Sequence, residues 1–387
     1  TTGKKNVLCK LASSLDEAID IAYVVYRGII EGCSHNFSKK TANLLSEDAF
    51  LKEVKDEAGF TSEQKVIIYQ MALGYRDHID RHREMTDNMC AEAITDGNHP
   101  LYDVIIVDET QDLTELQILA ICTLLKEGSK QLYLFGDDNQ AINPTIFTIE
   151  NAAACLQIAL GPGISVPIET LRGAYRSSNF LVNYINKFND IKRAAIGANG
   201  QENDMAERSL RDSKEEHGSI PRLITDPALA EALFHSPATF ASDTIVIVPS
   251  IELKEQLKQA YPEMEKDLVT IHEAKGREWD NAILYDFLSS SNDLWDAMLS
   301  PERAGKKSTL HRMLFNRFYV ALTRARDRII VVEDNVSKTI SDALLRPLVK
   351  ITKDSDIPQY LTDTLSKDDW YDYASRSFAR GDLADAD

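Results

Sequence analysis

Two adjacent carboxylates, Asp108 and Glu109, directly follow the short apolar run Val104–Val107. Such a run is typical of a buried parallel strand, and ligands of open α/β sheets bind outside the carboxyl ends of the strands. An aspartate at that edge can hold the Mg²⁺ of a nucleotide, and a glutamate beside it can orient an attacking water. Taken alone, the same pattern also fits a strand followed by an acidic turn.

A second polar segment, Gly136–Gln140, follows the apolar run Leu132–Phe135. Gln140 could sense a γ-phosphate through a hydrogen bond, and Gly136 permits a tight turn. An ordinary exit from a strand into a loop is the alternative interpretation.

Two segments supply arginines near predicted structural junctions: Arg176 lies within Ala174–Ser178, and Arg324 lies within Tyr319–Arg326. A planar guanidinium group suits the charge on a transferring phosphoryl group and can contribute roughly 10³–10⁵ in rate. A solvated or salt-bridged arginine is the alternative at each position.

The segment Val269–Asp280 combines several polar side chains around a turn at Lys275 and Gly276. Thr270 and His272 leave a predicted strand, and Glu278 could accept hydrogen bonds from a ribose. Trp279 could act as a stacking platform, or it could pack against its own domain.

The elements that must position these residues form two systems of strands alternating with helices, which predicts parallel sheets with helices on both faces. The first has an apolar stretch at Asn6–Leu11, a helix at Leu15–Glu31 with the capping pair Ser14 and Glu17, and a crossover helix at Leu113–Lys126. The second has four apolar runs that read as strands: Ile245–Val248, Leu268–Ile271, Ala282–Tyr285 and Ile329–Val332.

We therefore predict an α/β protein of two lobes with a hinge at Gly161–Gly163. The first lobe covers residues 1–160 with a helical insertion at about 34–97, the second covers residues 161–345, and a helical segment fills residues 346–387. The polar stretch Ala194–His217 is expected to be an exposed loop or a short insertion.

Composition limits the class of protein. The chain has 387 residues, 43% hydrophobic and 27% charged, and a net charge of −18. This acidity argues against a protein that coats DNA, although it allows a narrow strand-binding groove. The five cysteines never pair as CxxC, which favours reduced thiols buried as small hydrophobes rather than disulfides or a zinc site. We expect no membrane span or signal peptide, and a cytoplasmic location, or a nuclear one in a eukaryote.

Taken in order, these segments are more specific than any one of them. DETQD (108–112), GDDNQAI (136–142), AYRSS (174–178), the THxxKGxExD pattern from Thr270 to Asp280, and VALTRA (320–325) resemble motifs II to VI of the UvrD/Rep family of superfamily 1 helicases. The resemblance covers about 60% of the chain, from Val104 to Val332.

That resemblance implies two RecA-like lobes with ATP in the cleft between them and movement 3′ to 5′ along a single strand. It implies the following roles. Asp108 serves Mg²⁺ and Glu109 polarises water, and Gln140, Arg176 and Arg324 report on or stabilise the γ-phosphate. Tyr175 lies against the adenine, Glu278 meets the ribose, and Gln111 joins the nucleotide-binding set. Thr270 and His272 belong to the track for single-stranded nucleic acid, with DNA favoured over RNA.

The sequence departs from the family pattern in two respects. It contains no phosphate-binding string G-x-x-x-x-G-K-[ST], and Thr2–Lys5 is only a faint echo of it. The first residue is Thr1 rather than methionine, so we expect a fragment or processed product whose loop lies upstream; loss of the loop is the alternative. The second departure is size, because the roughly 93 residues between Arg176 and Thr270 leave no room for the family's large helical insertion.

Three functions remain open. The first is an ATP-dependent helicase or translocase core that is inactive or impaired without its loop, and the second is a helicase-like scaffold for protein contacts in a large multidomain protein. The third is a simple nucleotide-binding switch, which DNA or RNA would not stimulate. The C-terminal residues Trp370, Ala374, Phe378 and Gly381 fit the start of a tetratricopeptide-like array or a simple amphipathic helix. Five basic residues could contact phosphates or form a solvated face: Lys306, Lys307, His311, Arg312 and Arg317.

Overall fold

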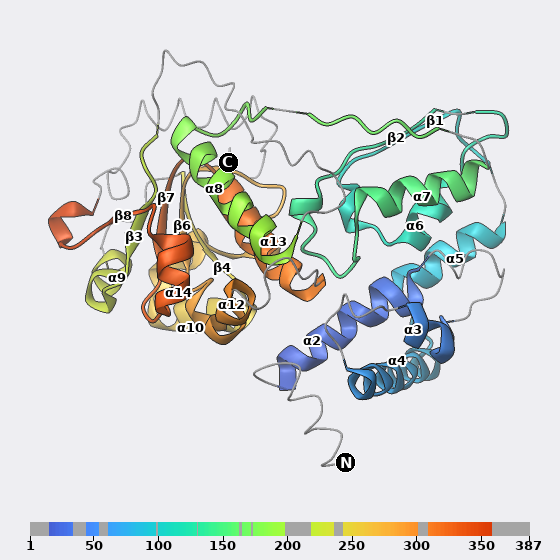
Figure 1. The fold of residues 1–387 in the computed structure, drawn as a ribbon, viewed down its shortest axis with the longest axis horizontal. Helices are drawn as coiled ribbons and strands as arrows, with labels where there is room; N and C mark the ends of the chain where they lie inside the picture. Colours follow the sequence, from blue (N-terminus) through green and yellow to red (C-terminus); the bar gives the residue numbers. More distant parts are fainter. Residues whose placement is uncertain are drawn as a thin grey trace. The chain divides into compact units, whose positions relative to one another are not determined.

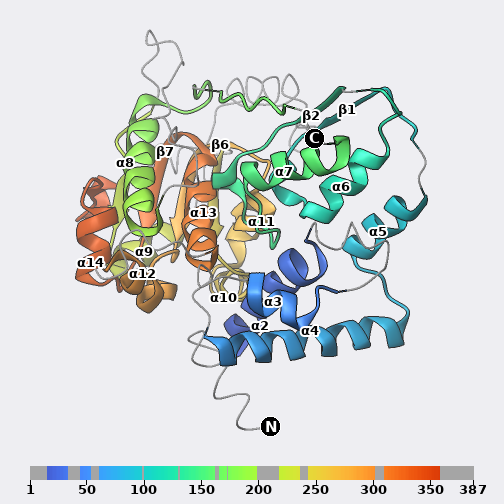
Figure 2. The same cartoon turned by 45° about the vertical axis from the view of Figure 1, so that its right-hand side comes forward.

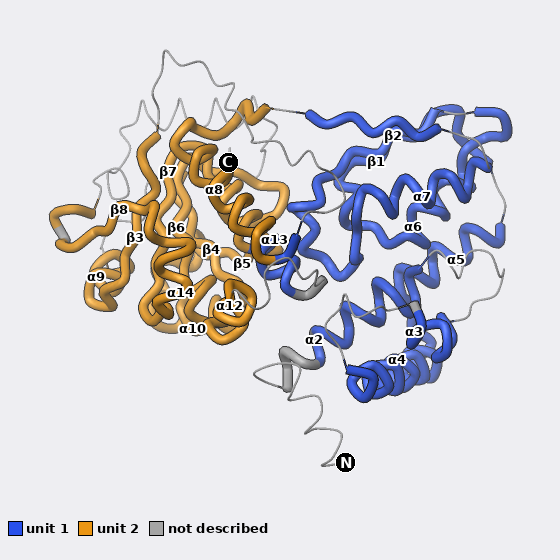
Figure 3. Tube along the Cα trace, in the orientation of Figure 1, with its two compact units in different colours: residues 1–171, 196–204, 304–317 blue, residues 172–195, 205–303, 318–387 orange. Residues whose placement is uncertain are grey.

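The computed structural model describes ten segments: residues 15–33, 44–53, 61–97, 100–129, 131–161, 165–171, 173–197, 218–235, 243–300 and 309–357. The chain divides into two compact units (Figure 3). Unit 1 contains residues 1–171, 196–204 and 304–317, and unit 2 contains residues 172–195, 205–303 and 318–387.

Several sequence-based predictions lie outside the described residues. They are the stretch Asn6–Leu11, Ser14 of the capping pair, Pro162 and Gly163 of the hinge, most of the Ala194–His217 loop, Lys306 and Lys307, and the C-terminal repeat residues.

The first described elements of unit 1 are helices (Figure 1). The predicted helix Leu15–Glu31 is present as α2 (Leu15–Val25), which continues as the π-helix η1 (Tyr26–Glu31). The described part of the predicted insertion forms α3 (Glu47–Glu53), α4 (Ser62–His82) and α5 (Asp87–Gly97). A capping box between Thr61 and Gln64 starts α4, and Arg83 ends it in a left-handed conformation.

The sheet of unit 1 is formed by two parallel strands, β1 (Val104–Val107) and β2 (Gln131–Leu134), in the described residues. The crossover between them contains α6 (Glu115–Thr123), and α7 (Ile149–Leu160) follows β2. Figures 1 and 2 show α6 and α7 on the same side of these strands. Leu132 and Leu134 of β2 pack against the core that the two helices form.

The prediction that β1 and β2 are buried strands is wrong. Ile106 is 68% exposed and Tyr133 is 52% exposed, because side chains of a strand alternate between faces and α6 and α7 cover one face. The apolar composition of both runs correctly predicted strands, but only half of each run is covered in the described structure.

Unit 2 contains a parallel sheet with the strand order β5-β4-β6-β7-β3-β8 in the described residues. Its strands are β3 (Arg222–Ile224), β4 (Thr244–Val248), β5 (Leu268–Thr270), β6 (Trp279–Tyr285), β7 (Ala325–Val332) and β8 (Val349–Lys350). The four predicted runs therefore form β4 to β7. The short strands β3 and β8 were not predicted, and β8 lies in the segment expected to be helical.

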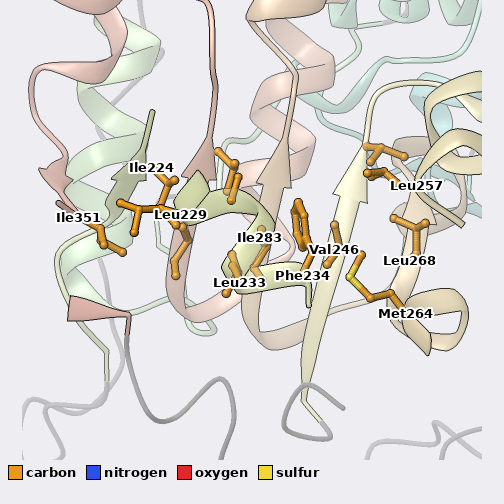
Figure 4. Packing of buried hydrophobic residues seen from close by; sticks show 14 residues of the cluster. Ile224, Leu229, Leu233, Phe234, Val246, Leu257, Met264, Leu268, Ile283 and Ile351 are labelled. Atoms are coloured by element: carbon orange, nitrogen blue, oxygen red, sulfur yellow. The ribbon is translucent and has the colours of Figure 1, made fainter. Parts of the chain in front are cut away.

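Helices cover both faces of this sheet. Their bounds are α8 (Asn179–Ile196), α9 (Pro227–Phe234), α10 (Ile251–Ala260), α11 (Ile271–Ala274), α12 (Asn292–Leu299), α13 (Thr309–Thr323) and α14 (Lys338–Ile340). On one face, α9 and α10 pack on Val246 and Ile283 (Figure 4). On the other, Phe188 of α8 and Phe318 of α13 have ring centroids 5.3 Å apart. The predicted fold class, α/β with helix-flanked parallel sheets, is confirmed.

Candidate functional site

The predicted acids lie at the carboxyl edge of the parallel sheet in unit 1. Val107 pairs with Leu134, so β1 and β2 end at the same edge. Asp108 and Glu109 leave β1 there with exposed side chains, and the Thr110 N–H donates to the carbonyl of Phe135 at 2.9 Å. The two strand exits are therefore tied together at the position where open α/β sheets bind ligands.

Glu109 has an unusual backbone conformation. Its φ of 51° is in the left-handed region, which residues other than glycine seldom adopt and which is concentrated at functional sites. Its N–H donates to Oδ1 of Asp108 at 2.9 Å. Two adjacent exposed carboxylates are hard oxygen donors, and Mg²⁺ commonly uses one or two of these together with substrate phosphates and water.

Gln111 orients Glu109 from a buried position. It is 1% exposed, its Nε2 donates to the Glu109 carboxylate, and its Oε1 accepts from the Asp137 N–H at 3.2 Å. A Cβ on Gly136 would lie 2.9 Å from Oε1 of Gln111. The resemblance implies that Gln111 binds the nucleotide, and the structure places it as a bridge between the exits of β1 and β2.

Gln140 lies in the 3₁₀ turn Asp138–Gln140 after β2 and is half-buried. Its Nε2 donates to Oδ2 of Asp137 at 3.0 Å, so the same loop carries Gln140 and the contact to Gln111. Burial, reinforced by Glu150, raises the pKa of Asp138 to about 7. Unit 1 thus gathers Asp108, Glu109, Gln111 and Gln140 on two connected loops.

A buried polar network, which we call the Asn88 network, joins the helices of unit 1 to the start of α6. Asn88 is fully buried, and its Nδ2 donates to the carbonyl of Arg27 at 3.0 Å and to Oε2 of Glu31 at 3.1 Å. Its Oδ1 accepts from Oγ1 of Thr114 at 2.6 Å, and Thr114 is the N-cap of α6.

The sequence-based reasoning did not identify these residues. Arg27 extends the network to the loop after the Gln140 turn, since its Nη1 donates to the carbonyl of Pro144 at 3.2 Å. The neighbouring Thr145 donates to the carbonyl of Gln111 at 2.7 Å. No local pattern signals such contacts, because their partners are dozens of residues apart.

In unit 2, the predicted residue Glu278 contacts the predicted Arg176 and a second arginine, Arg326, that was missed. Arg176 pairs with Oε1 of Glu278, and Nε of Arg326 donates to Oε2 of the same carboxylate at 3.3 Å. Arg176 is 74% exposed, whereas Glu278 and Arg326 are about 15% exposed. Glu278, expected to accept from a ribose, is thus held between two guanidinium groups. The spacing Arg324-x-Arg326 was the only sequence signal for Arg326.

Arg324 is buried rather than presented to solvent. Its guanidinium donates to the carbonyls of Val320 and Arg277 at 3.0 and 3.1 Å and to Oγ1 of Thr323 at 3.0 Å. The contact to Arg277 holds the turn before β6. A role on a γ-phosphate would require Arg324 to give up some of these contacts.

The residues implied for strand binding differ in exposure. Thr270 is 3% exposed and forms a capping box with Glu273 at the start of α11, whereas His272 is exposed. Burial raises the pKa of Glu273, but hydrogen bonds from Lys254 and Thr270 give it a net decrease. Glu273 therefore retains the charge that the capping box uses.

The two candidate stacking residues also differ. Tyr175 is 75% exposed and remains a candidate to lie against a base. Trp279 is 6% exposed and packs in its own unit, with the Arg277 guanidinium 5.0 Å from its ring centroid. The stacking role considered for Trp279 is therefore not supported by its position.

The cysteines and basic residues complete the comparison with the sequence. Cys122 and Cys155 are buried as expected, but Cys33 is half-buried and Cys90 is exposed on α5, so the buried interpretation is wrong for these two. His311, Arg312 and Arg317 are all half-buried on α13 rather than forming an open basic face. Within the described residues, no helix combines the length and apolar character needed to cross a membrane.

One protein-family model matches part of this chain. Residues 29–143 match the model of the UvrD/REP helicase N-terminal domain. This segment contains α3 to α6, both strands of unit 1 and the acids that follow β1. This match confirms the resemblance to UvrD-like superfamily 1 helicases over that segment. A comparison with curated protein sequences gives no significant match.

Three helicase structures are among the solved structures that this chain matches. They are the PRRSV helicase (14% identity, TM-score 0.32, 68% of this chain and 37% of that one), the C-terminal domain of a possible DNA helicase from Lactobacillus plantarum WCFS1 (15%, 0.26, 46% and 98%), and PRRSV nsp10 helicase (14%, 0.21, 59% and 35%). The chain thus spans 37% of the length of the first of them. At these TM-scores the similarities carry no functional argument.

Proposed function

We propose that this chain, whose residues 29–143 belong to the UvrD/REP helicase N-terminal domain family, is the ATP-coupling core of a 3′ to 5′ helicase or translocase. Its track would be single-stranded nucleic acid, with DNA favoured over RNA. The observation that carries the proposal is the pair Asp108 and Glu109 at the carboxyl edge of a parallel sheet, with Glu109 in a left-handed conformation and oriented by Gln111.

We assign Asp108 and Glu109 separate tasks in hydrolysis. Asp108 would hold Mg²⁺, which when bound neutralises charge on the nucleotide phosphates. Glu109 would accept a hydrogen bond from the attacking water and orient it. Its connection to Gln111 favours this task, because a buried amide restricts where the carboxylate can lie.

The polar groups around these acids would respond to the γ-phosphate. Gln140 donates to Asp137, and the N–H of Asp137 donates to Gln111, which contacts Glu109. A movement of Gln140 would therefore change the position of the Glu109 carboxylate. Arg176 would supply positive charge to the transferring phosphoryl group, as its exposed guanidinium permits. Tyr175, beside it in sequence, would lie against the base.

The 387 residues contain no G-x-x-x-x-G-K-[ST] string, and the amides and lysine of that loop normally cradle the phosphates. We therefore expect the chain alone to bind ATP weakly and to hydrolyse it slowly. The decisive assay uses the longest natural polypeptide that contains these residues.

That assay measures ATP hydrolysis with and without single-stranded DNA. We expect stimulation by the strand and a loss of at least a hundredfold in kcat in Glu109→Gln, because the variant keeps the shape of the side chain and removes its charge. Glu127→Gln is the matched control, since Glu127 is an exposed glutamate in a turn of the same unit. Partial duplexes with a 3′ or a 5′ tail then test polarity.

A second function is favoured by the net charge of −18 and the missing phosphate loop. In that case the chain is a helicase-like scaffold for protein partners, including partners bound through a C-terminal repeat array. It predicts equal background hydrolysis in the parent protein and in Glu109→Gln, with no response to DNA or RNA, and that result would overturn the enzymatic proposal.

A further inference from the structure

The loop that carries Arg176 is fixed to β7 at Arg326 and its neighbour. The N–H of Ser178 donates to the main-chain carbonyl of Arg326 at 2.7 Å, and Oγ of Ser178 donates to the carbonyl of Asp327 at 3.2 Å. The contact is tight, because a Cβ on Gly218 would lie 2.8 Å from both Asp327 and Ser178. The loop backbone is therefore anchored to β7 at Ser178, two residues after Arg176.

The side chain of Arg326 forms a second connection to the same loop. Its Nε donates to Oε2 of Glu278 at 3.3 Å, and its Nη1 lies 3.7 Å from Oδ1 of Asp280. Glu278 in turn accepts from Arg176 through Oε1. A continuous path of charged contacts thus runs from β7 through Glu278 to the exposed guanidinium of Arg176.

The register of the sheet explains why Arg326 points to these carboxylates. Trp279 of β6 pairs with Ala325 of β7, but Asn281 pairs with Arg328. Two residues of β7, Arg326 and Asp327, therefore oppose the single residue Asp280, which defines a β-bulge. Bulges redirect side chains and are frequent beside active sites.

The charges around Arg326 make this arrangement dependent on it. Burial and the neighbouring Asp280 raise the pKa of Asp243, and Arg326 opposes that rise. Arg326 therefore interacts with the carboxyl groups of Glu278, Asp280 and Asp243 together. Without Arg326, the largely buried Glu278 carboxylate would lose one of its two guanidinium partners, and its position would change.

We propose that Arg326 is a positioning residue for Arg176 and acts through the carboxylate of Glu278. This inference rests on the proposed function only for its consequence in catalysis. An exposed arginine loses side-chain rotamer entropy when it is ordered on a phosphate. Arg326 holds the Glu278 carboxylate in place, and this carboxylate restricts the Arg176 side chain before the ligand binds. The loss of entropy on binding is therefore smaller.

The same geometry gives Glu278 a different task from accepting a ribose hydroxyl. Both of its oxygens already accept from guanidinium groups, and its side chain is 15% exposed. Its first role is therefore to connect Arg326 to Arg176, so that the position of Arg326 determines where the Arg176 side chain lies. The conservative change Arg326→Lys keeps the charge but loses the two-pronged geometry that meets Glu278 and Asp280.

The first experiment is independent of nucleotide. In the full chain labelled with ¹⁵N-arginine, the Nε–Hε signal of Arg176 is assigned by its loss in Arg176→Lys. We expect Glu278→Gln and Arg326→Ala to shift this signal in the same direction. Arg328→Lys is the matched control, because Arg328 lies on the same strand and contacts Asn281 rather than Glu278. An Arg176 signal unchanged in Arg326→Ala would overturn the inference.

The second experiment is a double-mutant cycle on ATP hydrolysis by the longest natural polypeptide. We expect Arg326→Ala to lower kcat roughly ten- to hundredfold, the scale on which a small misplacement of a catalytic group acts, with partial recovery in Arg326→Lys. In an Arg176→Ala background the same change should have no further effect. Independent, additive losses would contradict action through Arg176.

The two experiments separate the possible failures. If the parent protein hydrolyses no ATP but the Arg176 signal responds to Arg326→Ala, the proposed function fails and the positioning contact stands. If hydrolysis is normal and the signal does not respond, the positioning inference fails alone. Thermal unfolding of each variant identifies a change that merely unfolds unit 2.

Discussion

Asn88 lies at the centre of the buried network in unit 1, and we predict that Asn88→Ala strongly destabilises this unit. The side chain is fully buried and connects α5 to η1 and to the N-cap of α6. Alanine removes one acceptor and one donor group without admitting solvent. The carbonyl of Arg27, Oε2 of Glu31 and the hydroxyl of Thr114 would each lose a partner.

The magnitude follows from the kinds of contact that are lost. The bonds to the Arg27 carbonyl and to Thr114 are neutral and contribute about 1 kcal/mol each, whereas the bond to the Glu31 carboxylate contributes about 1.5–3 kcal/mol. Glu31 keeps contacts from Tyr26 and Thr86, so the variant does not leave an isolated charge. We therefore expect a loss of roughly 3–5 kcal/mol, a large part of the 5–15 kcal/mol typical of a whole domain.

The assay must resolve unit 1 from unit 2. Hydrogen exchange in peptides covering α5 and α6, measured across a denaturant series, reports the free energy of opening of unit 1, while peptides of β4 report unit 2. Asn151→Ala is the matched control, because Asn151 is exposed on α7 and alanine has the higher helix propensity. A loss below about 1 kcal/mol in Asn88→Ala, or an equal loss in both units, would refute the role given to this network.

Three further outcomes are expected. Gly32→Ala should destabilise unit 1 by about 1–3 kcal/mol, because its Cβ would overlap the carbonyl oxygen of Arg27. Gly74→Ala in α4 should stabilise unit 1 by about 0.5–1 kcal/mol, because a Cβ there meets nothing within 4 Å. Denaturant midpoints of the two variants check both predictions. Burial raises the pKa of Glu333 from 4.5 to about 7. Its contribution to the free energy of unfolding of unit 2 is therefore complete below pH 4.5 and is lost as the pH rises through 7, by at most about 1.4 kcal/mol per pH unit. Glu333→Gln should reduce this pH dependence of the free energy of unfolding. In the native protein, a thiol reagent should modify the exposed Cys90 well before the buried Cys122, because burial raises the pKa of Cys122 to about 12; mass spectrometry of labelled peptides gives the order.

The strands were the part of the fold that the sequence predicted best, because a short apolar run bounded by polar residues has few other structures. Val104–Val107 was predicted as a strand and is one. Its burial was not predictable, since the coverage of each face depends on which helices pack there. For that reason Ile105 is half-buried whereas Ile106 is exposed, although both are isoleucines on the same strand. The strands β3 and β8 were missed because three or two residues give no periodicity.

The candidate site shows the same division. The acids after β1 and the arginines at 176 and 324 follow local patterns and could be named from the sequence. The contacts that define their environment join distant positions, such as Asn88 with Thr114 or Arg326 with Glu278. A bulge that shifts the register by one residue decides where Arg326 points, and no single-sequence pattern specifies that shift.

Burial separates Arg176, Arg324 and Arg326 of unit 2 more clearly than their motifs do. Arg324 is 5% exposed and is fixed to main-chain carbonyls on both sides of the turn before β6. Arg326 is 16% exposed and faces carboxylates, whereas Arg176 is 74% exposed and pairs with Glu278. A guanidinium that must contact a ligand needs N–H groups that water reaches in the absence of that ligand, and Arg176 meets this condition best. Arg324 and Arg326 keep the turn and the carboxylate beneath it in place, so a loss of either should appear first as disorder of Arg176.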